Sequence, residues 1–378
     1  MSWLQGGISI GKAFGIALKL HVSWFIIFAL VTWALTASYF PSVYPDWGLG
    51  TKIAAGILTS LLFFGSVLAH ELMHSIVSQR QGIPVTSITL FIFGGVSQIS
   101  GEPKQPKDEF RMAIAGPLTS LVIGGICWGI WFALQGIAGP AEFVSAIAYW
   151  LGWINIFLAG FNLIPGFPLD GGRVLRSILW GRSHDIRKAT RTASNIGRGV
   201  GFFFIFGGVF LIFYGLWFNG LWIILIGWFL ENAAVGSYRQ VALQDMLQGH
   251  TVDEIMSRDC LIISPEITIE QLVNEHILTS GRRCFPVASD GRALGMVTLH
   301  NIKAVPRDLW STQKVRDIMT PLDKLKWVQP RDELSSVLRI LTEGDINQLP
   351  VVQDHNIVGI VGRDNLLSFV EVRSGLGM

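Results

Sequence analysis

Long stretches without a single charged residue constrain this chain more than any other feature of its sequence. A helix needs about 20 apolar residues to cross the hydrocarbon core of a membrane. Of the 27 acidic residues, 18 lie after position 240, so charge and apolar runs occupy different parts of the chain. The sequence therefore predicts a polytopic membrane protein with a soluble C-terminal part. The uncharged runs are residues 22–39, 53–69, 112–141, 143–169 and 199–230.

The last of these runs is too long for one ordinary crossing. At 1.5 Å per residue, residues 199–230 would form a helix of about 48 Å, against a hydrocarbon core of about 30 Å. Asn219 and Gly220 break this run, so we predict a hairpin of two short spans there. The chain then crosses the membrane about six times, with the other spans at residues 22–39, 53–79, 112–135 and 143–163.

Positive charge indicates which side of the membrane each loop faces. Residues 164–198 carry seven Arg or Lys residues and only two acidic ones. The loop at residues 79–111 also holds Arg and Lys, whereas the links near residues 41–50 and 139–142 have almost none. Lys and Arg concentrate in cytoplasmic loops. Six spans across a cell membrane then place both termini and the soluble part in the cytoplasm.

A short β element is predicted between the second and third spans. Residues 85–100 (VTSITLFIFGGVSQIS) are rich in β-branched side chains and partly alternate. Gly94 and Gly95 lie in the middle, which indicates two strands around a turn or kink. Backbone groups near a membrane need hydrogen-bond partners. We therefore expect this membrane-associated element to be buried in protein or to line a wet cavity.

The soluble part contains an internal repeat at an offset of 63 and then 64 residues. Each unit is predicted as strand, helix, strand, strand, helix, with the first helices at residues 271–278 and 333–341. Matches at one offset over several blocks favour two copies of one structural unit that bury a shared face. We expect domains at residues 1–240, 241–310 and 311–378. The recurring blocks are VDEIM at 252–256 with VRDIM at 315–319, FPV at 285–287 with LPV at 349–351, and GMV at 295–297 with GIV at 359–361.

Residues 70–74, HELMH, place three ionisable side chains at the end of an apolar helix. Side chains at i and i+4 lie on one face of a helix, so His70 and His74 can bind one zinc ion. Glu71 lies beside them and can act as general base on a water that zinc activates. Ionisable residues inside a membrane are costly and by default functional. The alternative is a pair of pore-lining or hydrogen-bonded core histidines.

Asp170 is the candidate third ligand, because a catalytic zinc site takes three protein ligands and one open position. It is the only acidic residue between Glu142 and Asp185, and prolines and glycines break the helix around it. Irregular backbone at membrane depth is tolerated where it lines a water-filled cavity. The alternative is an N-cap for the following segment. Asn162 is a candidate oxyanion donor, or else a helix–helix hydrogen-bonding residue.

Together these motifs resemble the site-2 protease family of intramembrane zinc metalloproteases, in the branch with a C-terminal cystathionine-β-synthase (CBS) domain pair. The resemblance covers nearly the whole chain and also rests on FGG at 93–95, AGP at 115–117, and Asn162 with Pro165 and Asp170-Gly171. It implies a polytopic α-helical membrane domain with a small β element, followed by an α/β CBS pair.

The same resemblance implies a role for each candidate residue. His70, His74 and Asp170 would bind one zinc ion per chain, Glu71 would be the base, and Asn162 would help to hold the substrate or the oxyanion. Membrane-anchored proteins are the implied substrates, cut within or near the lipid bilayer during regulated intramembrane proteolysis. The strand region at 91–99 could then hold an unwound substrate by strand addition.

CBS pairs often bind adenine nucleotides, and the usual second strand ends in Gly, two hydrophobic residues, Thr or Ser, two further residues and Asp. Here the endings are GMVTLHN at 295–301 and GIVGRDN at 359–365, with Asn at both Asp positions. Thr298 and Asn301 are therefore the candidate nucleotide-binding residues. The alternative is a purely structural or dimerising module, and a CBS pair makes a homodimer plausible.

Two other functions stay open at this point. One is a CBS-gated membrane transporter or channel, whose intramembrane charges should be spread along a pathway. The other is a catalytically inactive membrane scaffold, against which the complete HELMH motif and Asp170 argue. The three cysteines form no CxxC pair, so no cysteine zinc site is expected. The net charge of +2 gives no reason to expect a nucleic-acid partner.

Overall fold

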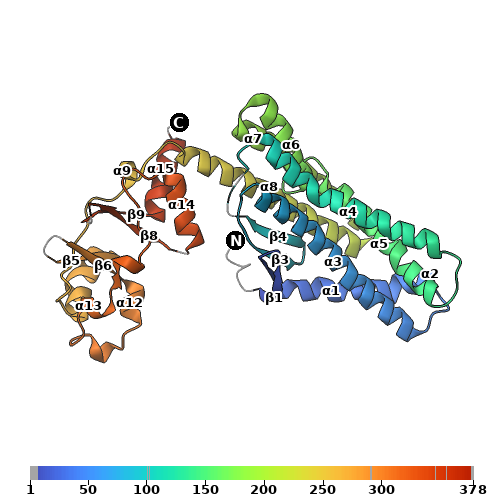
Figure 1. The fold of residues 1–378 in the computed structure, drawn as a ribbon, viewed down its shortest axis with the longest axis horizontal. Helices are drawn as coiled ribbons and strands as arrows, with labels where there is room; N and C mark the ends of the chain where they lie inside the picture. Colours follow the sequence, from blue (N-terminus) through green and yellow to red (C-terminus); the bar gives the residue numbers. More distant parts are fainter. Residues whose placement is uncertain are drawn as a thin grey trace. The chain divides into compact units, whose positions relative to one another are not determined.

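The computed structural model describes residues 7–375, apart from residues 100, 102, 290, 291, 345 and 355. The chain forms two compact units, Met1–Arg239 and Gln240–Met378 (Figure 1). The first unit holds the apolar helices and a small sheet, and the second holds the repeats. Each unit has hydrophobic clusters of its own.

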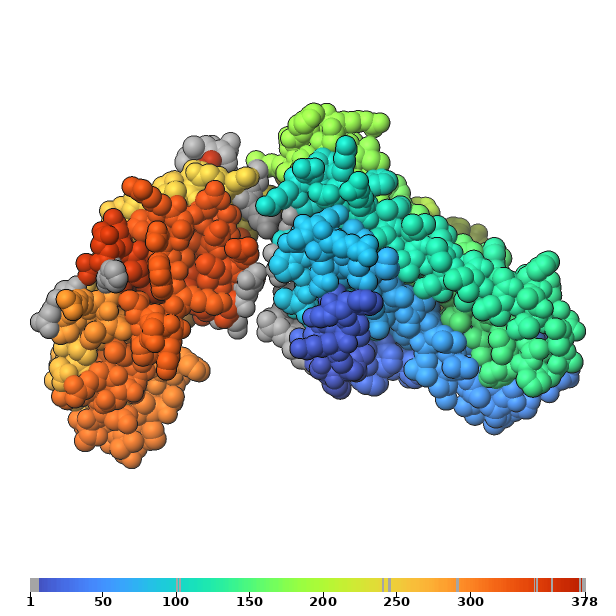
Figure 2. Space-filling model, in the orientation of Figure 1, coloured from blue at the N-terminus to red at the C-terminus, as the bar shows by residue number. Residues whose placement is uncertain are grey.

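The first unit confirms the prediction of about six spans. Among the described residues, six helices are long and apolar enough to cross a membrane. The first combines α1 (Val22–Ala34), the π-helical turn η2 (Leu35–Tyr39) and α2 (Phe40–Val43). The others are α3 (Leu49–Arg80), α4 (Pro106–Leu134), α5 (Pro140–Asn162), α7 (Ile186–Phe213) and α8 (Trp217–Leu247). In the space-filling view α4, in teal, adjoins α5, in green, as expected of a closely packed pair (Figure 2).

The last hairpin differs in detail from the prediction. The break lies at Tyr214–Leu216, where Gly215 has a φ of +83°, and Asn219 and Gly220 are inside α8. Gly220 packs against the backbone of Gly208 on α7, so it serves close helix–helix approach. The two helices have 28 and 31 residues because they continue beyond the uncharged run at both of its ends. They are therefore not the short spans that the hydropathy pattern predicted.

The predicted β element belongs to a larger sheet. β3 (Val85–Phe91) and β4 (Gly94–Ile99) are the two predicted strands, and they pair antiparallel; Ser100 lies outside the described residues. Two further strands, β1 (Ile8–Ala13) and β2 (Ile16–Leu20), extend the sheet in the order β1-β2-β3-β4. β2 and β3 pair in parallel, which connects the N-terminal residues to the loop after α3. The β1–β2 hairpin was not predicted from the sequence.

The second unit contains the two repeats, and together with the first unit it confirms the predicted fold class. The first repeat comprises α9 (Val252–Ile255), the helical run α10, η3 and α11 (Ile269–Ser280), β5 (Cys284–Ser289), β6 (Arg292–Thr298), α12 (Leu299–Lys303) and the 3-10 turn η4 (Arg307–Leu309). The second comprises α13 (Val315–Ile318), β7 (Thr320–Pro321), the 3-10 turn η5 (Leu322–Lys324), α14 (Leu334–Glu343), β8 (Gln348–Gln353), β9 (Asn356–Gly362) and α15 (Arg363–Gly375). The predicted first strand of each repeat is reduced to one parallel bridge, Ile263 with Val287 and Val328 with Val351.

The two repeats exchange their first segments. Val252 of the first repeat is buried in the cluster that contains Leu341 and Leu349 of the second. Val315 of the second repeat is buried with Phe285 and Val297 of the first. Each hydrophobic cluster includes a residue from the other repeat. Local unfolding of one repeat should therefore unfold the other as well.

Leu341→Ala tests this exchange. The side chain is 0% exposed, so its truncation should cost about 2–5 kcal/mol of opening free energy. Native-state hydrogen exchange should then speed up in amides of both repeats. Leu278→Ala, at a position that is 73% exposed, should change opening by less than about 0.5 kcal/mol. Faster hydrogen exchange confined to amides of residues 315–375 would contradict the swap of first segments between the repeats.

Candidate metal centre

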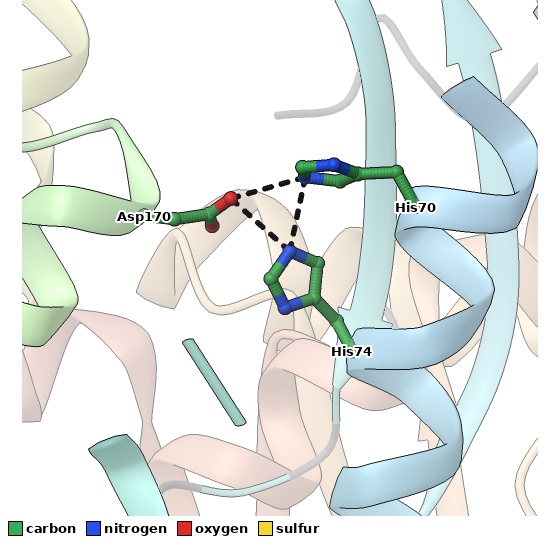
Figure 3. Close-up of side chains that lie close together, drawn as sticks. All are labelled: His70, His74 and Asp170. Carbon is green, nitrogen blue, oxygen red and sulfur yellow. Dashed lines mark hydrogen bonds and ion pairs between the residues drawn. The ribbon is translucent and has the colours of Figure 1, made fainter. Parts of the chain in front are cut away.

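Three predicted ligands meet at one point inside the first unit (Figure 3). His70 and His74 project from one face of α3, and Asp170 begins α6 (Asp170–Ser183), 100 residues after His70. Oδ2 of Asp170 lies 3.1 Å from Nε2 of each histidine. The two Nε2 atoms are 3.2 Å apart. In the part of the chain that the structure describes, this is the one such group of three metal-binding side chains.

The second ring nitrogen of each histidine is hydrogen-bonded to α4. Nδ1 of His70 lies 2.9 Å from Oγ of Ser120, and Nδ1 of His74 lies 2.7 Å from the carbonyl oxygen of Met112. A carbonyl can only accept, so Nδ1 of His74 carries the proton, and we assign the same tautomer to His70. The unprotonated Nε2 atoms then face Asp170. Such partners fix the tautomer and the ring orientation of metal-binding histidines.

The spacing of the three ligand atoms suits zinc. A tetrahedral site with bonds of 2.0–2.1 Å has ligand–ligand distances of about 3.3–3.4 Å. The observed 3.1–3.2 Å triangle is close to one face of that tetrahedron. Two imidazoles and a carboxylate are also a ligand set found in catalytic zinc sites. Gly116 of α4 makes room at this point, because a Cβ there would collide with Nε2 of both His70 and His74.

Glu71 lies next to the ligands and is held by the sheet. Its Oε2 accepts a hydrogen bond of 3.0 Å from Oγ of Ser97 on β4. Gly95, two residues earlier on that strand, lies against the side chain of Glu71, and a Cβ at Gly95 would collide with Cγ of Glu71. The side chain of the candidate base therefore lies where α3 faces β4.

Asp170 reaches the histidines because the link between α5 and α6 folds tightly. Gly171 and Gly172 pack against the backbone of Leu163–Phe167, where no Cβ would fit. Leu169 is the N-cap of α6, so Asp170 is the first helical residue and not the cap that the sequence left open. A carboxylate in the first turn is favoured by the helix dipole.

A buried ion pair connects α6 to α4. Nε of Arg176 donates to Oε1 of Glu109 at 2.6 Å, and the guanidinium also lies over the ring of Phe167, 5.2 Å from its centroid. Arg176 is 5% exposed and Glu109 is 0% exposed. Because α4 carries the partners of both histidines and α6 carries Asp170, this pair fixes the third ligand relative to the other two.

Asn162 occupies the C-terminal end of α5 and is half-buried. Its Nδ2 donates to the carbonyl oxygen of Leu158 at 3.0 Å, one turn back on the same helix. A side-chain amide has two N–H donors, so one is left for another acceptor. The hydrogen bond to the helix itself is not the helix–helix contact that the sequence left open.

Thr298 and Asn301, the candidate nucleotide-binding residues, cap α12. Oγ1 of Thr298 lies 2.6 Å from Oδ1 of Asn301, and the backbone N–H of Thr298 donates to the same oxygen at 3.0 Å. Nδ2 of Asn301 donates to Oγ1 of Thr320 at 3.3 Å. In the second repeat Asn365 accepts a hydrogen bond from the backbone of Gly362. Asn at the usual Asp position thus has a capping role in both repeats.

The cysteines are not part of the candidate metal centre. Cys127 is on α4, whereas Cys260 and Cys284 belong to the second unit. Burial raises the pKa of the Cys284 thiol to about 12, which keeps the free thiol protonated at neutral pH.

Several residues that shape the site were missed or undervalued by the sequence analysis. Arg176 was counted only as a cytoplasmic charge, and Ser97 only as part of a strand. Gly116 was noted in the AGP motif without a role. Ser120 and Glu109 lie i+4 and i−7 from Gly116, so all three share one helical face. This shared helical face was the sequence pattern from which a role for these residues in the site could have been inferred.

Comparisons with known proteins identify families and relatives that this chain resembles. The chain matches Peptidase family M50 over residues 58–143 and 137–208, and the CBS domain over residues 252–307 and 315–372. It is 35% identical to sll0528 of Synechocystis sp., named as a zinc metalloprotease, over 98% of this chain and 97% of that one. It is 34% identical to Rip3 of Mycobacterium tuberculosis, also named as a zinc metalloprotease, over 98% and 94%. The solved site-2 protease from Methanocaldococcus jannaschii is 29% identical, with a TM-score of 0.42, and covers 62% of this chain and 95% of its own.

Gly116→Ala tests the space between the histidines. The added methyl group should displace Nε2 of His70 and His74, so the purified variant should lose most of its zinc in elemental analysis. Gly125→Ala on the same helix is the matched control, because a Cβ there meets nothing within 4 Å. Full zinc content in both variants would contradict the proposed position of the metal.

Arg176→Met tests the buried ion pair. The change leaves Glu109 buried without its guanidinium and should cost about 3–5 kcal/mol of unfolding free energy, measured by SDS titration in mixed micelles. The double variant Arg176→Met/Glu109→Leu removes both charges and should recover most of that loss. If the single variant is as stable as the wild type, the pair does not hold α6 in place.

Proposed function

Because this chain belongs to the site-2 protease family of zinc metalloproteases, Peptidase family M50, we propose that it cleaves membrane-anchored proteins within or near the bilayer. One observation carries the proposal: two imidazoles on an apolar helix and a carboxylate from a broken helix converge at one buried point, with Glu71 beside them. A peptide bond at membrane depth could be reached only by a site at that depth.

We assign each residue a role from its position. His70, His74 and Asp170 would hold one zinc ion, which would supply Lewis-acid activation of water at neutral pH. Glu71 takes the proton of the attacking water and passes it to the leaving amine nitrogen as the peptide C–N bond breaks. The free N–H of Asn162 donates to the oxyanion that develops on the peptide carbonyl.

An extended substrate suits the arrangement of the sheet. Among the described strands, β4 pairs only with β3, so its other backbone edge has no strand partner. A substrate helix that unwinds must satisfy its backbone hydrogen bonds, and strand addition at β4 would do so beside Glu71. This supports membrane-anchored helices, locally unwound, as the substrate class.

We further propose that the six spans place both termini and the CBS pair in the cytoplasm. The basic residues of α6 and the start of α7 support this, since Lys and Arg concentrate on that side. The transporter alternative is disfavoured because the intramembrane ionisable groups converge at one point. The inactive-scaffold alternative is disfavoured because the ligand triangle and the base are both intact.

Glu71→Gln is the test of the hydrolytic mechanism. The variant keeps the ligands but loses the base, so it should bind zinc normally and lose at least about 100-fold in kcat. The assay uses single-span reporter proteins, each with an Asn-Pro break in the cytoplasmic half of its helix, in liposomes. Asp170→Ala should instead lose zinc. Equal cleavage by wild type and Glu71→Gln would refute the mechanism.

We propose that the CBS pair regulates the protease by binding an adenine nucleotide at the Thr298 side. The hydroxyl of Thr298 and the amide of Asn301 lie at the end of β6, and an amide can hydrogen-bond ribose hydroxyls without carrying charge. Gly362 offers no hydroxyl at the equivalent place in the second repeat. A homodimer through the CBS pair is part of the same proposal.

Equilibrium binding of labelled ATP to the purified full chain tests this regulation. Thr298→Ala should weaken binding about tenfold, whereas Thr298→Ser retains both the hydroxyl and the cap and should bind normally. Thr342→Ala, which removes a helix hydroxyl of the second repeat, is the control. Absence of binding at millimolar ATP would rule out a nucleotide sensor.

A further inference from the structure

One face of β4 lies against the helix that carries the catalytic motif. Gly95 touches the side chain of Glu71, Ser97 hydrogen-bonds to it, and Ile99 packs against the same hydrophobic cluster as Leu72 of α3. These three residues alternate along the strand, so they share one face. The catalytic helix and the strand with a free edge are therefore in direct contact at Glu71.

The hydroxyl of Ser97 is the only side-chain donor to the carboxylate of Glu71 among the interactions of the described residues. Its distance to Oε2 is 3.0 Å. Behind it, Oγ of the buried Ser75 lies 3.2 Å from Oγ of Ser97 and 2.9 Å from the carbonyl oxygen of Glu71. Ser97 is thus positioned by α3 one turn after Glu71 as well as by its own strand.

The lack of a side chain at Gly95 also contributes to this contact between β4 and Glu71. Any Cβ at residue 95 would collide with Cγ of Glu71, so a glycine there allows the carboxylate to reach Ser97. The register places Ser97 opposite Ile88 and Gly95 opposite Leu90 of β3. A shift of β4 along β3 would separate Ser97 from the carboxylate.

We propose that Ser97 is a positioning residue for the base, through which β4 sets the orientation of the Glu71 carboxylate. This rests on the proposed protease function and adds that substrate binding at β4 is coupled to the orientation of Glu71. A substrate strand that adds to the free edge of β4 stiffens the strand whose hydroxyl holds Glu71. Bound substrate thereby helps to align the base, and an empty edge leaves it less ordered.

The proposal predicts a defect in turnover rather than in binding. A hydrogen bond to a charged group that is needed in the transition state is worth about 10- to 100-fold in rate. Ser97→Ala should therefore lower kcat by about that factor on a reporter that the wild type cleaves. KM should change by less than about threefold, and zinc content, measured separately, should stay at the wild-type level.

Two variants keep the test specific. Ser97→Thr retains a hydroxyl and should restore most of the lost kcat. Ser87→Ala removes a buried hydroxyl from the neighbouring strand β3, where it donates to Gln98 at 2.8 Å, and should cleave as the wild type does. This control makes the same chemical change in the same sheet without touching Glu71.

The outcomes separate this proposal from the protease function itself. If Glu71→Gln is inactive while Ser97→Ala turns over as fast as the wild type, Ser97 has no positioning role and the protease function stands. If Ser97→Ala loses zinc, or if Ser97→Thr is folded and as slow as Ser97→Ala, the hydroxyl is not acting on the base and the proposal is overturned. Activity in Glu71→Gln would instead remove the function on which it rests.

Discussion

The convergence of His70, His74 and Asp170 is the constraint on which the rest of the first unit depends. Two rings and a carboxylate in an apolar bundle are costly unless each is held by partners. α4 supplies those partners through Ser120 and the carbonyl of Met112. It also leaves a space at Gly116 where the ligand atoms meet.

The same helix connects the two halves of the site. Glu109 on α4 binds Arg176 on α6, and α6 starts with Asp170. β4 contacts Glu71 through Ser97 and Gly95. The proposed ligands are thus held by helix packing, whereas the proposed base is held by the sheet. That division separates the candidate metal centre from the element that an extended substrate would engage.

Local rules allowed part of this to be predicted from the sequence. The i, i+4 spacing of His70 and His74 guarantees a shared helical face, and the length of the uncharged runs required membrane helices. Asp170 could be proposed as the third ligand because it is an isolated acidic residue where prolines and glycines interrupt the helix. In the second unit, the repeat offset revealed the paired fold but not the exchange of first segments, since that depends on contacts between the repeats.

Other features depend on tertiary packing that no local pattern encodes. Asn219 and Gly220 look like a break, yet α7 lies so close at Gly208 that Gly220 serves packing inside α8. The β1–β2 hairpin is short and gains its partners only when β2 pairs with β3. The ion pair of Glu109 with Arg176 joins residues 67 positions apart, and each looks like an ordinary loop charge in the sequence.

We propose that these three side chains form a zinc site without sulfur ligands. X-ray absorption at the zinc edge of the purified full chain tests it most directly. We expect nitrogen and oxygen ligands at about 2.0–2.1 Å with the outer-shell scattering of two imidazoles, and the loss of one imidazole signal in any zinc retained by His74→Ala. A sulfur ligand at about 2.3 Å, or an unchanged spectrum in that variant, would contradict it.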